Sequence, residues 1–219
     1  MEAIPIEWTK LEQNGEAPSK RSGHTMTEVN GSTILFGGID FKSPPGPNND
    51  LYRAELGIDE VVWSKPEVQG AEQPVARWKH TATRIGENLI LFFGGFFDST
   101  TRLNDSWILN TETLEWYMPE SVLASSTPAA EHTETKDDED DDSRYLNVSK
   151  RDYLDDLGQG GDAAAAGIAP VDNNPDAPTP CGAHSAVLVG TFVYVFGGYG
   201  GAAFSRRDFN DVKKFNIET

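Results

Sequence analysis

The sequence predicts an all-β fold made of repeated four-stranded blades, of the kind that form a β-propeller. A proline, an arginine or cysteine, and a histidine recur at intervals of three residues in three copies, each followed by an apolar run ending in two glycines and then by an Asn-Asp step. Tryptophans at 8, 63 and 116 keep the same phase, with spacings of 55 and 53 residues. A period near fifty residues with one Trp and a glycine pair per unit is typical of propeller blades.

The strands of a blade are clearest in the second copy. Short segments rich in β-branched and aromatic residues alternate there with turn residues such as Gly86-Glu87-Asn88. We therefore predict four strands, named a, b, c and d in chain order, at 80–85, 89–93, 106–110 and 114–117.

The remaining repeat positions have structural explanations. The glycine pair after each b strand allows positive φ, or lets a neighbouring blade approach where a Cβ would clash. The Trp of strand d fills the wedge between blades, because one sheet cannot bury both of its faces alone. We assign a structural role to the repeat residues Trp8, Arg21, His24, Gly37, Gly38, Trp63, Arg77, His80, Gly94, Gly95, Trp116, His184, Gly197 and Gly198.

This ordered set of features resembles the kelch family. The resemblance covers roughly residues 5–119 and 178–219, and it is specific because five features recur in one order: Arg and His, the apolar run, Gly-Gly, Asn-Asp and Trp. It implies four-stranded antiparallel blades around a central axis. It also implies loops that are displayed to a partner protein.

An acidic insert separates the second and third copies. Between 120 and 180 there are 15 acidic and 4 basic residues, among flanks rich in Ala, Gly, Pro and Asn. Such a composition cannot bury enough apolar surface to offset the entropy of ordering. We therefore predict three regions: kelch blades in 1–119, a largely disordered low-complexity insert in 120–177, and a third kelch repeat in 178–219. Residues 145–157 are either part of a solvated spacer or a short amphipathic segment that folds against a partner.

The two ends of the chain hold complementary parts of one blade. The third copy carries strands a to c but lacks the Trp expected near 222–224, while Trp8 has no a, b or c strand ahead of it. We therefore predict that an N-terminal strand completes the last blade. Two arrangements remain open: a homodimer that closes a six-bladed ring, or a longer chain that supplies the remaining blades.

Composition predicts a protein of the cytoplasm or the nucleus. The 219 residues are 37% hydrophobic, without an uninterrupted apolar stretch long enough for a membrane span, and the N-terminus resembles no secretory signal. A single cysteine forms no disulfide framework. We expect no nucleic acid partner, because residues outside 120–180 include 20 acidic and 14 basic side chains.

The sequence favours a non-catalytic protein. Three of the four histidines occupy one repeat-equivalent position, where a packed, hydrogen-bonded role is expected. Cys181 replaces the repeat arginine and is interpreted as a small buried residue. No metal or cofactor is predicted, since phosphate-loop, zinc and EF-hand spacings are absent from the sequence.

The expected binding surface is the face formed by the b–c and d–a connections, here called the loop face. Its b–c loops are 39–48, 96–103 and 199–209. Exposed aromatic and arginine side chains on loops are common anchors of protein interfaces. For Phe41 and Phe96, packing back against their own blades is an equal alternative. The candidate partner-binding residues are Phe41, Phe96, Phe97, Arg102, Phe204, Arg206 and Arg207.

These observations predict a scaffold that binds a protein or peptide through the loop face. The alternative is a regulatory or substrate-targeting kelch module of a larger enzyme or ligase complex.

Overall fold

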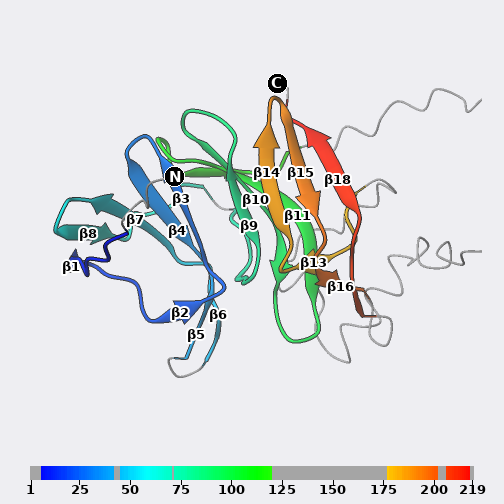
Figure 1. The fold of residues 1–219 in the computed structure, drawn as a ribbon, viewed down its shortest axis with the longest axis horizontal. Helices are drawn as coiled ribbons and strands as arrows, with labels where there is room; N and C mark the ends of the chain where they lie inside the picture. Colours follow the sequence, from blue (N-terminus) through cyan, green and yellow to red (C-terminus); the bar gives the residue numbers. More distant parts are fainter. Residues whose placement is uncertain (1–5, 42–44, 71, 120–176, 202–205, 218–219) are drawn as a thin grey trace, which may run out of the picture.

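A computed structural model describes residues 6–41, 45–70, 72–119, 177–201 and 206–217. Its sheets stand side by side as three blades, one from each copy of the repeat (Figure 1). The predicted insert lies outside the described residues except for its last residue, and so does Phe204.

The first blade is an antiparallel sheet with one additional parallel strand. Its a, b, c and d strands are β3 (Thr25–Val29), β4 (Ser32–Phe36), β7 (Leu51–Leu56) and β8 (Glu60–Ser64). The additional strand, β1 (Glu12–Gly15), pairs with β8 in parallel register and lies at the outer edge of the sheet (Figure 1). The blade therefore has five strands in the order β1-β8-β7-β4-β3.

The second blade confirms the four strands predicted from the sequence. They are β9 (Thr81–Arg84), β10 (Leu89–Phe96), β11 (Arg102–Asn110) and β12 (Glu115–Tyr117). β11 begins earlier than predicted because its antiparallel pairing with β10 resumes beyond a register shift between Phe93 and Gly95. The third blade contains β14 (Ser185–Val189), β15 (Phe192–Phe196) and β18 (Val212–Asn216), so it has strands a to c among the described residues.

Two short sheets extend the first and third blades at their loop end. One consists of β2 (Arg21–Ser22), β5 (Ile39–Asp40) and β6 (Gly46–Pro47), the other of β13 (Cys181–Gly182), β16 (Tyr199–Gly200) and β17 (Arg207–Asp208). Four of these strands, β5, β6, β16 and β17, lie in segments predicted as b–c loops, since strands of two residues have no detectable periodicity. Both sheets lie at the same end of the blades (Figure 1).

The core consists of apolar layers between neighbouring blades. Between the first two, Phe36 packs against Phe92 and Trp116 with ring centroids 5.1 Å away in each case. Between the second and third, Leu91 and Phe93 meet Val193 and Val195. The buried Trp116 thus fills an inter-blade layer, as its place in the repeat predicts.

The unpredicted strand β1 is itself a repeat feature. Asn14 lies six residues after Trp8 and pairs in parallel with Val62 of β8. Gln69 lies six residues after Trp63 and forms a parallel bridge with Glu115 of β12. In both places the segment that follows a repeat tryptophan runs beside strand d of the next blade.

Candidate functional site

The repeat arginine connects the glycine pair and the Asn-Asp step of its own blade. Arg77 is fully buried, and its guanidinium forms two hydrogen bonds with Asp105, of 2.7 and 2.8 Å. It also donates to the carbonyl of Gly94 at 3.1 Å. One side chain therefore joins the glycine pair to the Asn-Asp step, which explains why the two features recur together.

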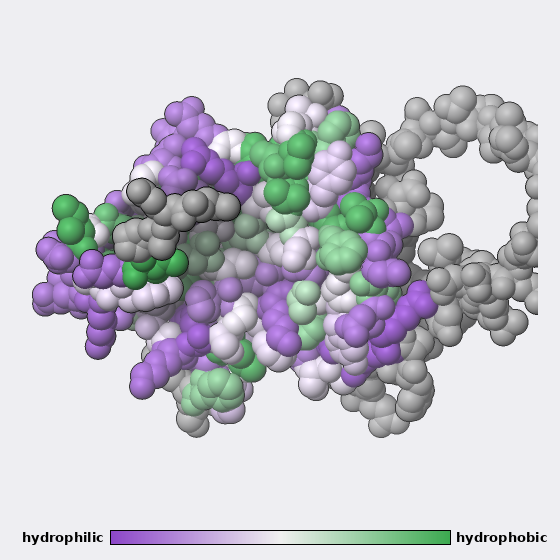
Figure 2. Space-filling model, in the orientation of Figure 1, coloured by the Kyte–Doolittle hydropathy of each residue, from purple (hydrophilic) through white to green (hydrophobic). Residues whose placement is uncertain are grey.

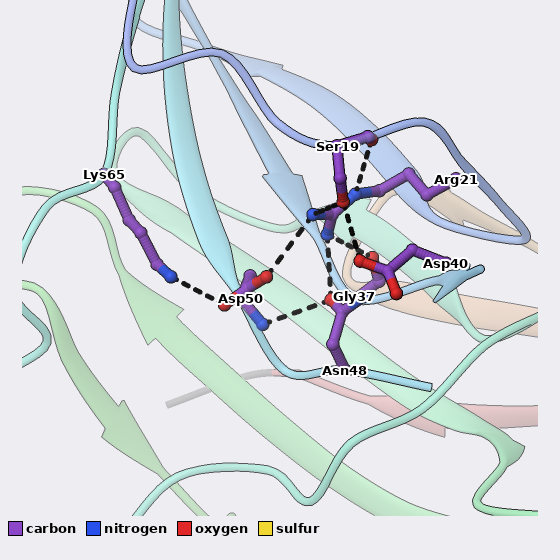
Figure 3. A network of polar contacts seen from close by, with 7 residues as sticks. All are labelled: Ser19, Arg21, Gly37, Asp40, Asn48, Asp50 and Lys65. Carbon is purple, nitrogen blue, oxygen red and sulfur yellow. Dashed lines mark hydrogen bonds and ion pairs between the residues drawn. The ribbon is translucent and has the colours of Figure 1, made fainter. Parts of the chain in front are cut away.

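Arg21 makes the corresponding contacts in the first blade (Figure 3). It donates to the carbonyl of Gly37 at 3.0 Å and pairs with Asp50 at 3.3 Å. Lys65 binds the other carboxylate oxygen of Asp50 at 2.8 Å. Burial alone would raise the pKa of Asp50, but hydrogen bonds and charge from Lys65 and Arg21 outweigh burial and lower it.

The third blade has no arginine at this position. Cys181 is buried there, and burial raises the pKa of its thiol to about 12. Asp211, the counterpart of Asp105, has a half-exposed carboxylate with Lys213 at 3.9 Å. Water can therefore solvate the carboxylate of Asp211, whereas the buried carboxylate of Asp105 in the second blade needs Arg77 as its partner.

The repeat histidines connect one blade to the next. The hydroxyl of Thr25 lies 2.8 Å from Nε2 of His80, and the hydroxyl of Thr81 lies 3.0 Å from Nε2 of His184. Burial lowers the pKa of His184 to about 4, although a hydrogen bond with the backbone of Phe93 opposes that effect. Burial also lowers the pKa of His80 well below its usual value, and the nearby charge of Arg77 adds to this. These buried histidines are neutral at physiological pH.

On the loop face, five side chains of the second and third blades form a cation–aromatic cluster. Arg102 stacks on Phe96 at 3.9 Å and lies 5.7 Å from the ring of Tyr199. Trp78 meets Phe96 edge to face with centroids 5.4 Å apart, and the ammonium group of Lys79 lies 5.1 Å from the ring of Trp78. Phe96 and Arg102 are buried, whereas Lys79 and Tyr199 are exposed. The buried side chains of Phe96 and Arg102 contact the exposed side chains of Lys79 and Tyr199.

The other predicted binding residues that the structure describes lie on the b–c loops of all three blades. Phe41 is 79% exposed, and Phe97 is half-buried. Arg206 donates to the carbonyl of Thr100 at 3.1 Å, so it bridges the loops of the second and third blades. Arg207 is exposed and lies 5.7 Å from the ring of Phe209. For all of these residues, contact with a partner stays a prediction.

Three members of the cluster are absent from the sequence-based candidates. Trp78 and Lys79 stand directly before the repeat histidine, and Tyr199 follows the third glycine pair. The signal in the sequence that could have identified these three residues is their position beside a repeat motif. Only the fold, however, brings residues 78–79, 96 and 199 together.

Within the described ranges, no three His, Cys, Asp or Glu side chains are arranged so that they could hold a metal ion. The same part of the chain contains no helix of the length and apolar character that crossing a membrane requires.

The blades and their repeated contacts are those of a β-propeller repeat protein. A family profile described as the KLHDC2/KLHL20/DRC7 Kelch-repeats domain matches residues 5–140. Since this match covers more than half of the 219 residues, the chain belongs to the kelch-repeat family.

Several longer proteins are similar to part of the chain. The dynein alpha chain of the flagellar outer arm of Chlamydomonas reinhardtii is 35% identical over 135 residues, which cover 61% of this chain and 3% of that protein. Acyl-CoA-binding domain-containing protein 4 of Arabidopsis thaliana is 32% identical over 127 residues, 58% of this chain and 18% of that protein. Host cell factor 1 of Homo sapiens is 33% identical over 152 residues, 62% of this chain and 7% of that protein. The matched segments thus span only a small share of these relatives.

Proposed function

We propose that this chain is a non-catalytic interaction module that binds a protein or peptide partner through its loop face. The observation that carries the proposal is the cation–aromatic cluster of Trp78, Lys79, Phe96, Arg102 and Tyr199. Its members come from two blades, and aromatic and arginine side chains are enriched among residues that dominate binding energy. Membership of the kelch-repeat family supports an interaction role in general terms.

The charges of the loop face favour a partner segment that carries carboxylates. Lys79 and Arg207 are exposed, and each lies beside an aromatic ring. A partner carboxylate could accept hydrogen bonds from these cations while an apolar side chain contacts Tyr199. The acidic tract at 137–142 has the same chemistry, so it would compete with such a partner if it reached this face.

The proposal is tested by comparing partner capture between two charge variants of the loop face and one control variant. Lys79→Glu and Arg207→Glu reverse charges on the loop face, whereas Arg84→Glu reverses a charge near the opposite, a–b turn. We expect the unmodified chain and Arg84→Glu to retain the same partners from cell extract, and Lys79→Glu and Arg207→Glu to lose them. Retention of every partner by both loop-face variants, with their thermal melts unchanged, would exclude this face.

A second candidate function is a regulatory or targeting module within a larger polypeptide. The relatives favour it, because the matched segments cover at most 18% of the length of the three proteins compared above. Sequencing the full transcript tests it, since further domains in the same reading frame are expected under this candidate and a stop codon directly after Thr219 is not.

A further inference from the structure

One carboxylate closes the b–c loop of the second blade, residues 97–101. The backbone N–H groups of Thr100 and Thr101 both donate to Oδ1 of Asp98, at 2.7 and 2.6 Å. The hydroxyl of Thr100 donates to the same oxygen at 2.8 Å, and the hydroxyl of Thr101 donates to Oδ2 at 3.2 Å. Burial alone would raise the pKa of Asp98, but these hydrogen bonds outweigh burial and lower it. The carboxylate is therefore charged at physiological pH and accepts four hydrogen bonds from its own loop.

This loop belongs to a polar part of the surface. It connects β10 with β11 at the loop end of the blades, which lies at the lower end of the view (Figure 1). That end of the second and third blades is mainly hydrophilic (Figure 2). Asp98 is half-buried, and Ser99 and Thr100 are exposed. Hydrogen bonds to Asp98, rather than a layer of apolar side chains, therefore hold the loop in one conformation.

The contacts of Asp98 also determine where the carbonyl of Thr100 points. This carbonyl and the N–H of Thr101 belong to one planar peptide unit, in which they point in opposite directions. Since the N–H is directed at Asp98, the carbonyl is directed out of the loop. There it accepts a hydrogen bond of 3.1 Å from the guanidinium group of Arg206, which belongs to the b–c loop of the third blade. Asp98 thus orients the acceptor that joins the two loops.

The same loop holds the guanidinium group of Arg102. Nη1 of Arg102 donates to the carbonyls of Asp98 and Thr101, at 3.3 and 3.4 Å. The carbonyl of Thr101 also accepts from the N–H of Phe97 at 3.1 Å, which brings the two ends of the loop together. The guanidinium group stacks in addition on the ring of Phe96. Arg102 is therefore fixed between the closed loop and an aromatic ring of the cluster.

We propose that Asp98 is a positioning residue of the loop face, which fixes Arg102 and Arg206 before a partner binds and does not contact the partner itself. The exposed side chains of Lys79 and Tyr199 are then displayed on groups that are already ordered. Ordering these groups before binding removes their entropy cost from association. This inference rests on the proposed function of the loop face.

Hydrogen exchange and NMR test the positioning role without a partner. In Asp98→Ala the N–H groups of Thr100 and Thr101 lose their acceptor, so their amide exchange should become about tenfold faster. The guanidinium N–H signals of Arg102 and Arg206 should merge with the averaged signals of mobile arginines. Asp208→Ala is the matched control, since Asp208 is exposed on the third-blade loop and its loss changes the charge of the same face equally. The control should change neither measurement.

Asp98→Asn separates positioning from direct contact with a partner. The amide oxygen of asparagine can still accept from both backbone N–H groups, and its NH2 group can donate to the hydroxyl of Thr101. We therefore expect this variant to keep the amide exchange and arginine signals of the unmodified chain, and to retain the partners captured from cell extract. Asp98→Ala should bind the same partners about tenfold more weakly, at an unchanged melting temperature.

The outcomes distinguish this inference from the proposed function. Unchanged amide exchange and arginine signals in Asp98→Ala would overturn the positioning role, whatever the partner does. Partner loss in Asp98→Asn with intact exchange would overturn it too, because the charge itself would then be the contact. If Lys79→Glu and Arg207→Glu retain every partner, the proposed function fails, while the exchange measurement still decides whether Asp98 holds the two arginines.

Discussion

At the residue scale, one repeat position shows how burial decides which side chain is required. Arg77 and Asp105 form an ion pair in which both partners are almost fully buried. Removal of one partner from such a pair leaves an uncompensated buried charge. In the third blade the equivalent carboxylate, Asp211, is half exposed, so Cys181 is tolerated in place of the arginine.

The replacement of Arg77 by Met should therefore lower the free energy of unfolding by about 3–5 kcal/mol, because Asp105 would lose its partner. Arg84→Met is the matched control. Arg84 pairs with Glu28 at 2.9 Å with both side chains exposed, and exposed pairs contribute at most about 1 kcal/mol. Urea denaturation followed by circular dichroism measures both. Equal losses in the two variants would contradict the assignment of Arg77 as the buried connector.

The buried histidines predict a pH dependence of stability. In the folded state the pKa of His184 is about 4, compared with 6.5 in the unfolded chain, so the unfolded state alone gains the proton between these values. The contribution of His184 to the free energy of unfolding is therefore fully present above about pH 6.5. It declines by on the order of 3 kcal/mol as the pH falls toward about 4. The lowered pKa of His80 acts in the same direction.

Urea midpoints measured between about pH 7 and 4.5 test this expectation, since carboxylates titrate mainly below that window. His184→Gln should reduce the slope of the midpoint against pH. A midpoint that stays constant over the window would show that the histidines are free to protonate in the folded state.

At the scale of elements, the repeat tryptophan contributes differently to stability in each copy of the repeat. Trp116 lies in the layer between the first two blades, where it meets Phe36, Phe92 and Trp107. Trp8 has the same place in the repeat but is exposed. The environment supplied by the neighbouring blade, rather than the motif, determines its contribution to stability.

Trp116→Ala should cost about 3–5 kcal/mol of unfolding free energy, because it leaves a cavity in a packed layer. Trp8→Ala should leave the unfolding free energy nearly unchanged, because Trp8 is exposed. Chemical denaturation measures both variants. If Trp116→Ala unfolds at the same midpoint as the unmodified chain, the assigned blade register is wrong.

At the scale of the whole molecule, charge is distributed unevenly along the sequence. Residues 120–180 contain 15 of the 35 acidic side chains and 4 of the 18 basic ones. The exposed cations Lys79 and Arg207 belong to the loop face. Electrostatic interaction between such regions changes binding rates and weakens with added salt.

Deletion of residues 131–160 should leave the melting temperature nearly unchanged, because their composition contributes little apolar surface to a core. Affinity for a captured partner should rise if the acidic tract competes with that partner, and fall if it recruits a basic one. In both cases the difference should shrink as salt approaches about 0.5 M. A large drop in melting temperature would instead show that the insert is part of the folded structure.

The sequence by itself determined the class of fold, because the determinants of a blade recur at fixed spacing. Arg77, the glycine pair and Asp105 are close in sequence and belong to one blade, so their repetition indicates a local unit that folds the same way each time. The four strands of the second blade followed from the same signals. The two-residue strands β2 and β5 did not, since they are too short for a periodic pattern.

Only the tertiary structure decided which residues are exposed and which lie together. Phe96 and Arg102 look like exposed loop anchors in the sequence, but they stack on each other beneath Lys79 and Tyr199. The pairing of Thr25 with His80 joins residues 55 positions apart. Such contacts depend on how one blade packs on the next, and packing between blades is a property of their combined surfaces that no single repeat contains.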